Sequence, residues 1–147
     1  MPDLLPRAQG VVRFDMNRWD DLHGRVVRRI AARIDLPSPG RGEIVVMGDT
    51  LGLHLTVNPD TDELIVTLCE GAAPGGDDWV EVEELADCIG REIGWSWSAI
   101  NSQGYWDLFA LAFDGIVPNV AFLGMASTID VLRMAPLSEP RSPVRPE

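Results

Sequence analysis

The chain has 147 residues, of which 46% are hydrophobic and 24% charged, and its formal net charge at pH 7 is −11. This length and composition are typical of one soluble domain with its own hydrophobic core. No apolar run approaches the roughly 20 residues that cross a bilayer, and the N-terminus lacks the basic start and apolar centre of a signal peptide. With two cysteines and no export signal, we expect a cytoplasmic protein with buried thiols.

The charge is unevenly distributed along the chain. Residues 42–132 carry sixteen acidic side chains against the single Arg91, whereas residues 1–41 carry eight arginines and five aspartates. A body this acidic offers no cationic patch that would release phosphate counterions, so we expect neither nucleic acid nor an anionic membrane as partner. It suits a basic protein partner. The alternative is that the acidity only keeps the protein soluble.

Residues 17–34 predict an amphipathic N-terminal helix. Leu22, Val26, Ile30 and Ile34 recur every four residues and would form its buried stripe. Its arginines would face a partner, face solvent, or dock onto the protein's own acidic body; they are Arg25, Arg28, Arg29 and Arg33.

Short apolar runs predict strands over 43–47, 51–57 and 63–68, with the turn-rich segment 58–62 as a hairpin loop. That loop lacks the glycine and the distal glutamate of a calcium-binding loop. A second short helix is predicted over 79–89, ending at Gly90 in the left-handed conformation. Its polar side is the most concentrated acidic surface of the sequence and a candidate binding surface: Glu81, Glu83, Glu84 and Asp87.

A tryptophan-rich hairpin is predicted around the type I turn Asn101-Ser102-Gln103-Gly104. A three-residue loop pairs Asn101 with Tyr105. Counting outward then sets Ala99 opposite Asp107 and Ile93 opposite Phe113. The same counting sets Trp97 opposite Phe109 and Trp95 opposite Leu111, so we expect an aromatic ladder in the core. The small residues on the other side, Gly94, Ser96 and Ser98 among them, would let a helix or loop approach closely.

Two further strands are predicted over 119–125 and 128–134, followed by a proline-rich tail over 135–147 that we expect to be disordered. The predicted fold is therefore α+β. It comprises a single domain over 1–134 with a mainly antiparallel sheet of about five or six strands, the N-terminal helix and the second short helix.

The polar tip of the hairpin is the second candidate site. Asn101, Tyr105 and Asp107 share a face there and would grip a ligand or a partner's arginine, or would serve only to cap the turn. His23 and His54 have no metal-ligand spacing with Cys69 or Cys88, and no nucleophile motif or phosphate-binding loop is present. We predict no cofactor, no metal and no catalytic residue.

The pattern Trp95-x-Trp97-x-x-x-Asn101-x-x-Gly104-Tyr105-x-Asp107, with the apolar strand to Phe113 and the Ala126-Ser127 turn, resembles a group of small bacterial proteins of unknown function. The likeness covers roughly residues 80–134. In size and acidity this group is similar to immunity-type proteins of bacterial toxin systems. The resemblance implies no activity and no site residues.

Two functions remain as hypotheses. The first is a non-enzymatic interaction protein, such as an immunity or accessory factor, whose acidic body binds a basic protein partner. The second is a small-molecule-binding or enzymatic domain with a pocket around Asn101, Tyr105 and Asp107. A homodimer through a sheet edge or the tryptophan-rich face is compatible with either.

Overall fold

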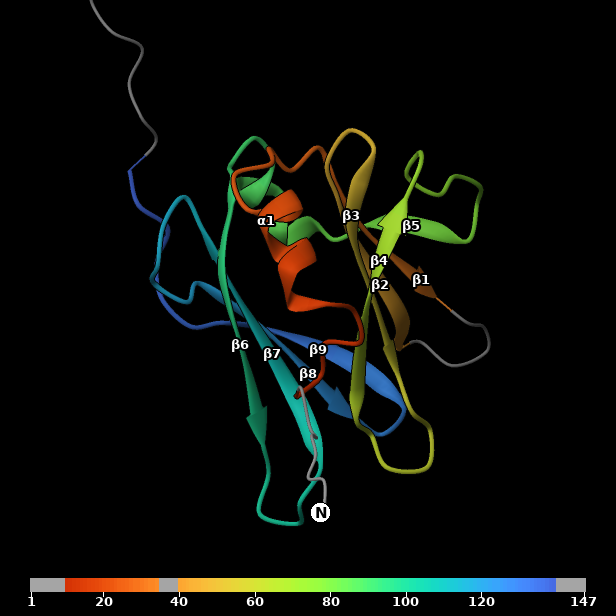
Figure 1. The fold of residues 1–147 in the computed structure, drawn as a ribbon. Coiled ribbons are helices and arrows are strands. Elements are labelled where there is room, and N and C mark those ends of the chain that lie inside the picture. The colour runs from red at the N-terminus through yellow and green to blue at the C-terminus, as the bar shows by residue number, and fades with distance from the viewer. Residues whose placement is uncertain (1–9, 35–39, 140–147) are drawn as a thin grey trace, which may run out of the picture.

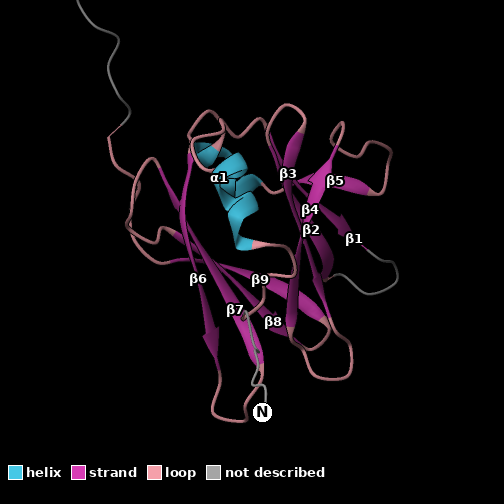
Figure 2. Ribbon diagram, viewed as in Figure 1, coloured by secondary structure: helices cyan, strands magenta, loops and turns pink. Residues whose placement is uncertain are grey.

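The computed structural model describes residues 10–34 and 40–139, and it consists of two antiparallel sheets packed face to face (Figures 1 and 2). The five-stranded sheet has the order β4-β3-β2-β1-β5 and the four-stranded sheet the order β6-β7-β8-β9. The strands are β1 (Arg29–Ile34), β2 (Arg41–Met47), β3 (Leu51–Val57), β4 (Leu64–Glu70), β5 (Trp79–Glu81), β6 (Ile93–Ile100), β7 (Trp106–Phe113), β8 (Val120–Met125) and β9 (Thr128–Arg133). The helical elements are η1 (Met16–Arg18), α1 (Trp19–Leu22) and η2 (Glu83–Cys88).

The predicted α+β class is wrong, because the described chain is a two-sheet β-sandwich with nine strands rather than one sheet of five or six beside two helices. The element that decides the class is the predicted helix over 17–34. Its helical part is α1, and Gly24 follows at φ 87°, where the chain turns away. The second half of the predicted helix is β1, which lies between β2 and β5.

The second predicted helix, over 79–89, is wrong as well. Trp79–Glu81 forms the short edge strand β5 beside β1, and residues 83–88 form the 3₁₀-helix η2 rather than an α-helix. Its predicted end is confirmed, because Gly90 adopts φ 90°. Without a side chain, a glycine takes this left-handed backbone at little cost, and so the chain turns from η2 toward β6.

The five-stranded sheet confirms the strands predicted over 43–47, 51–57 and 63–68 and the hairpin loop between the last two. Strands β1 to β4 follow one another as an antiparallel meander, whereas β4 and β5 lie at opposite edges. Residues 71–78 connect those edges. Ala73 and Trp79 pack there on a second small cluster, formed by Ala31, Val45 and Met47 on the outer face of the sheet.

The four-stranded sheet is a simple meander and confirms the strands predicted over 119–125 and 128–134. The turn of the tryptophan hairpin is also as predicted: Asn101 N donates to Tyr105 O at 2.8 Å, and Gly104 adopts φ 90°. Ile93 faces Phe113, again as predicted.

Between the turn and the Ile93–Phe113 pair, the predicted register of the hairpin is wrong. Ile100 pairs with Trp106 but Ala99 pairs with Leu108, so Asp107 is the extra residue of a β-bulge. The shift of one residue sets Trp97 opposite Ala110 and turns the tryptophan to the outer face. A second irregularity between Ile93 and Ser96 restores the register. The predicted aromatic ladder is therefore not in the core, and Trp95 is 53% exposed.

One hydrophobic core fills the space between the sheets, with Leu53 and Leu55 from one sheet and Phe109 and Phe122 from the other. At one end the short helix α1 lies between the sheets and contributes the fully buried Leu22 (Figure 2). The small residues of β6 admit the N-terminal segment, as predicted: Val11 N donates to Ser98 Oγ at 3.3 Å.

The C-terminal segment continues past β9 and is held to the sandwich up to the end of the described residues. Leu137 packs against the core, and the buried side chain of Asn119 donates to the carbonyls of Ala135 and Pro136. The rest of the predicted tail, residues 140–147, lies outside the described residues. In the described part, no helix has the length and apolar character that crossing a membrane requires.

Candidate functional site

The polar tip of the hairpin has the geometry of a turn cap. Asn101 Oδ1 accepts the backbone N–H of Gln103 at 2.8 Å and of Tyr105 at 3.2 Å, and Asn101 Nδ2 donates to Asp107 Oδ2 at 2.9 Å. The structure thus brings the side chains of Asn101 and Asp107 into contact, whereas Tyr105 contacts Asn101 through its backbone. The side chain of Tyr105 is exposed. These bonds hold the turn and its bulge and occupy both polar atoms of the Asn101 amide.

The predicted acidic surface on residues 81–87 binds the protein's own arginines. Glu81 Oε2 accepts from Arg29 Nε at 2.6 Å, and Asp87 Oδ1 accepts from Arg133 Nη2 at 2.9 Å. Glu84 is held at two points by Arg41, whose hydrogen bonds hold the pKa of the Glu84 carboxyl below its usual value. Glu83 is exposed and has no ion pair in the described part of the chain.

Three of the four arginines of residues 25–33 therefore dock onto the acidic body, one of the alternatives left open by the sequence, whereas Arg25 donates to the carbonyl of Asp21. Arg28 pairs with Asp49 and Arg33 with Glu43, while Arg29 reaches Glu81. These contacts neutralise positive charge that would otherwise be offered to a partner. They also neutralise part of the acidity, so the remaining carboxylates matter more for any binding function.

A groove lies at the end of the sandwich where η2, the start of β6, the end of β7 and the C-terminal segment meet. It encloses about 780 Å³ and we call it the acidic groove. Its lining residues are Val26, Asp87, Ile89, Gly90, Arg91, Glu92, Asp114, Ser138 and Glu139. Of the residues predicted as sites, only Asp87 lines it.

The local backbone explains why these side chains converge. After Gly90, the carbonyl of Arg91 accepts from Val27 N, which joins this segment to the residues that precede β1. The carbonyl of Glu92 accepts from Asp114 N, which joins the same segment to the end of β7. Asp114 adopts φ 65° and its Oδ1 accepts Glu92 N at 2.8 Å. Aspartate tolerates this left-handed backbone better than most residues.

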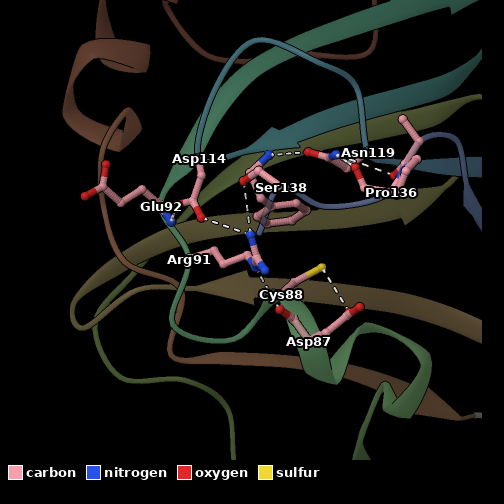
Figure 3. A network of polar contacts seen from close by, with 10 residues as sticks. Asp87, Cys88, Arg91, Glu92, Asp114, Asn119, Pro136 and Ser138 are labelled. Carbon is pink, nitrogen blue, oxygen red and sulfur yellow. Dashed lines mark hydrogen bonds and ion pairs between the residues drawn. The ribbon is translucent and has the colours of Figure 1, made fainter. Parts of the chain in front are cut away.

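Arg91 forms the centre of the groove, and its side chain is only 12% exposed (Figure 3). Its guanidinium donates to Asp114 Oδ2 at 3.2 Å, to Ser138 Oγ at 3.4 Å and to the carbonyl of Asp87 at 3.1 Å. Two other carboxylates of the lining, on Glu92 and Glu139, have no ion pair within residues 10–34 and 40–139. The groove therefore has an excess of negative charge.

Asn119 does not line the groove but holds the C-terminal segment that does (Figure 3). Its side chain is 3% exposed, and its Oδ1 accepts Phe113 N at 2.8 Å while its Nδ2 donates to Pro136 O at 3.1 Å. This residue thereby positions the segment that carries Ser138 and Glu139. Its one signal in the sequence is an asparagine beside Pro118 at the start of a predicted strand, but its contact with the C-terminal segment could not be deduced from the chain.

The groove and its surroundings provide charged side chains but no activated cysteine nucleophile. Burial, and after it the neighbouring Asp87 carboxylate, raises the pKa of the Cys88 thiol to about 11. Burial also raises the pKa of Cys69. Both cysteines are therefore protonated at neutral pH and weak as nucleophiles. Among the described residues, no group of three or more His, Cys, Asp or Glu side chains is arranged to hold a metal ion.

Comparison with protein families shows a match to a family of unknown function, DUF6334, over residues 11–138. The chain belongs to this family. The match confirms the predicted relationship to an uncharacterised group and extends well beyond residues 80–134, because it includes α1 and the whole five-stranded sheet. It also includes Ser138 at the rim of the acidic groove. Comparisons with curated proteins and with solved structures gave no match.

Proposed function

We propose that this DUF6334 protein is a non-enzymatic interaction domain that binds a basic segment of a partner protein in the acidic groove. The observation that carries the proposal is the composition of the groove lining, which contains four acidic residues, Asp87, Glu92, Asp114 and Glu139, and one arginine, Arg91. A lysine or arginine of a partner would meet carboxylates there rather than a neutral surface. Such complementarity increases the association rate and gives specificity.

The internal ion pairs support this location over the surface predicted from the sequence. Glu81 and Glu84 are already bound to Arg29 and Arg41, so a partner would have to displace an existing pair to use them. Glu92 and Glu139 have no such competitor in the described part of the chain. A cationic side chain of a partner can therefore bind these two carboxylates without first breaking an internal ion pair.

Arg91 supports the proposal as a positioning residue. Its guanidinium donates to both Asp114 and Ser138 and so links the end of β7 to the C-terminal segment. Because it is largely buried and already paired, it offers little positive charge to an approaching cation. The cellular role that we propose is that of an accessory or immunity-type factor, which masks a basic surface of its partner.

The test is a titration of the full chain with a short arginine-rich peptide, followed by amide chemical shifts and by calorimetry. We expect the largest shifts at residues 91, 92, 114 and 138, and an affinity that falls as salt is raised. Glu92→Gln and Glu139→Gln each remove one carboxylate, and we expect each to weaken binding about threefold to tenfold.

Glu83→Gln is the matched control, because it makes the same substitution at an exposed carboxylate outside the groove. If this control weakens binding as much as Glu92→Gln does, the affinity depends only on the net charge of the protein, and the groove is not the binding site. A glutamate-rich peptide that binds equally well would contradict the proposal.

The alternative, a small-molecule or catalytic site at Asn101, Tyr105 and Asp107, stays a prediction from the sequence. The cavities described on the surface are lined by other residues. The hydrogen bonds of Asn101 support the structural interpretation of that tip.

A further inference from the structure

The loop between β7 and β8 leads from the acidic groove to two exposed apolar side chains. Asp114 lines the groove, and Ile116 and Val117 follow it in the chain with exposed fractions of 60% and 55%. Among the large hydrophobic residues that the structure describes, these two are the most exposed. Single exposed apolar residues are normal on a protein surface, whereas a group of them beside a charged groove marks an interaction site.

This loop is fastened at both ends. At its start, Asp114 N donates to Glu92 O at 2.8 Å, and Asp114 Oδ1 accepts from Glu92 N at 2.8 Å (Figure 3). At its end, the ring of Pro118 fixes one backbone angle, and Asn119 N donates to Leu111 O at 2.9 Å. A short loop bonded in this way has little freedom left to lose when a partner binds, so its apolar side chains are presented at low entropic cost.

Trp95 adds a third exposed apolar residue beside the loop. Its backbone N–H donates to the carbonyl of Gly115 at 3.3 Å, and the residue is 53% exposed. We call Trp95, Ile116 and Val117 the apolar rim. Within the groove itself, the lining residue Ile89 is also exposed. Carboxylates and apolar side chains therefore alternate along one continuous stretch of surface.

We infer that the apolar rim binds a large apolar side chain of the same partner segment whose arginine or lysine enters the acidic groove, an inference that rests on the function proposed above. The rim is continuous with the groove through the backbone of residues 114–117. The groove attracts the cation, and burial of an apolar side chain on the rim adds a contribution that salt does not screen. An anionic membrane also offers apolar groups, but the carboxylates of the groove repel its surface.

The chain geometry sets the spacing of the two groups in the partner. Ile116 follows Asp114 by two residues, so their Cα atoms lie at most about 7 Å apart. In an extended peptide, side chains two positions apart are separated by about the same 7 Å and point to the same side, whereas neighbours point to opposite sides. We therefore expect the apolar residue two positions from the basic one.

The test is a titration of the full chain with two peptides of identical composition, Leu-Gly-Arg-Gly-Leu and Gly-Leu-Arg-Leu-Gly, both acetylated and amidated. We expect the first to bind about threefold to tenfold more tightly, because its leucines reach the rim when its arginine is in the groove. Amide chemical shifts at residues 116 and 117 should then move together with those at 92 and 114. As salt is raised, both affinities should fall while their ratio persists.

Ile116→Ser and Val117→Ser should each reduce the difference between the two peptides. Both side chains are exposed, so we expect little effect on stability. The matched control is Val80→Ser on β5 of the other sheet, where the wild-type side chain is 47% exposed, and it should leave both affinities unchanged. A cooperative thermal transition establishes that each variant folds, and Val117→Thr, which keeps the shape of the side chain, replaces any variant that does not.

Equal affinities for the two peptides, with shifts at residues 92 and 114, would overturn this inference and leave the proposed function intact. So would a difference in affinity that both serine variants preserve. If these peptides and the arginine-rich peptide all leave residues 92 and 114 unshifted, the proposed function and this inference fail together. Leu-Gly-Ser-Gly-Leu should bind far more weakly than its arginine counterpart; equal binding would contradict the inference, because the rim would then select an apolar segment without a cation.

Discussion

Arg41 and Glu84 form an ion pair between two regions of opposite charge, the arginine-rich N-terminal region and the acidic body. Arg41 Nη1 donates to Glu84 Oε2 at 2.6 Å and Nη2 donates to Oε1 at 2.8 Å. Such a planar two-point contact is specific to arginine, since lysine presents a single charged point. The pair fastens η2 to the first residue of β2 and so supports one wall of the acidic groove.

Glu84→Gln should lower the free energy of unfolding by at most about 1 kcal/mol at neutral pH, because the pair is partly exposed and screened by solvent. Arg41 lowers the pKa of folded Glu84 from the 4.5 of the unfolded side chain. The stabilisation is therefore fully present above pH 4.5 and is lost as the pH falls through the lower, folded pKa. Urea unfolding of wild type and variant at several pH values measures this difference. Glu83→Gln is the matched control, because it makes the same substitution at a carboxylate without an ion pair in the described part of the chain.

Asn119→Ala should be more damaging than the loss of this surface pair. It leaves the buried N–H of Phe113 without its acceptor and removes the donor to Pro136, which together should cost about 2–4 kcal/mol. The C-terminal segment should also detach locally. Hydrogen exchange would report the loss as faster exchange at Met134 and Ala135, whose N–H groups donate to the carbonyl of Asn119. Asn119→Asp keeps the acceptor for Phe113 but sets a buried carboxylate oxygen against the carbonyls of Ala135 and Pro136, so it should also be destabilising. An alanine variant as stable as the wild type would contradict this account.

Much of the strand content was predictable from local signals, because the hairpins around residues 58–62 and 101–104 carry their own turn chemistry. The fold class, in contrast, was not predictable from local signals. Residues 26–34 contain apolar residues at helical spacing, but they also contain the β-branched pair Val26-Val27, and Gly24 precedes them. Whether such a segment becomes a strand depends on its neighbours, and here β2 and β5 pair with both of its edges.

The tryptophan hairpin shows a second limit of what can be predicted from the sequence. The turn determines the register only until the first bulge, and the bulge at Asp107 depends on the bond between its side chain and Asn101. One extra residue exchanges the two faces of β6, which is why the predicted core ladder is an exposed surface. The acidic groove could not be predicted at all, because its walls come from segments near residues 26, 90, 114 and 138 that only the tertiary structure brings together.

The turn between β8 and β9 offers a stabilising substitution. Ala126 and Ser127 adopt φ 53° and 66°, which costs free energy for residues with a Cβ. Asn-Gly is the preferred pair for a two-residue turn with both φ values positive, so Ala126→Asn with Ser127→Gly should raise the free energy of unfolding by about 0.5–1 kcal/mol. Thermal unfolding measures the gain. The backbone N–H groups of both residues donate to Asp62 and are kept in this variant.

Asp62→Ala is the complementary change at this turn. It removes the acceptor of both N–H groups, and we expect a loss of about 1–2 kcal/mol. The loss should persist in the Asn-Gly background, since the turn donors are unchanged there. If Asp62→Ala is neutral in both backgrounds, solvent replaces the carboxylate and the contact does not join the two sheets.

The two cysteines should differ in reactivity toward an alkylating reagent, because they differ in burial and in pKa. Cys88 is fully buried with a pKa of about 11, so at slightly alkaline pH it should react only when the chain opens. Cys69 is partly exposed with a raised pKa, and it should react in the folded state but more slowly than a free thiol. Mass spectrometry of the labelled chain over time, with and without urea, separates the two sites. Since Arg133 holds Asp87 beside the Cys88 thiol, Arg133→Gln should loosen η2 and accelerate labelling of Cys88 but not of Cys69. Equal rates at the two cysteines in the native protein would show that η2 does not seal the end of the core.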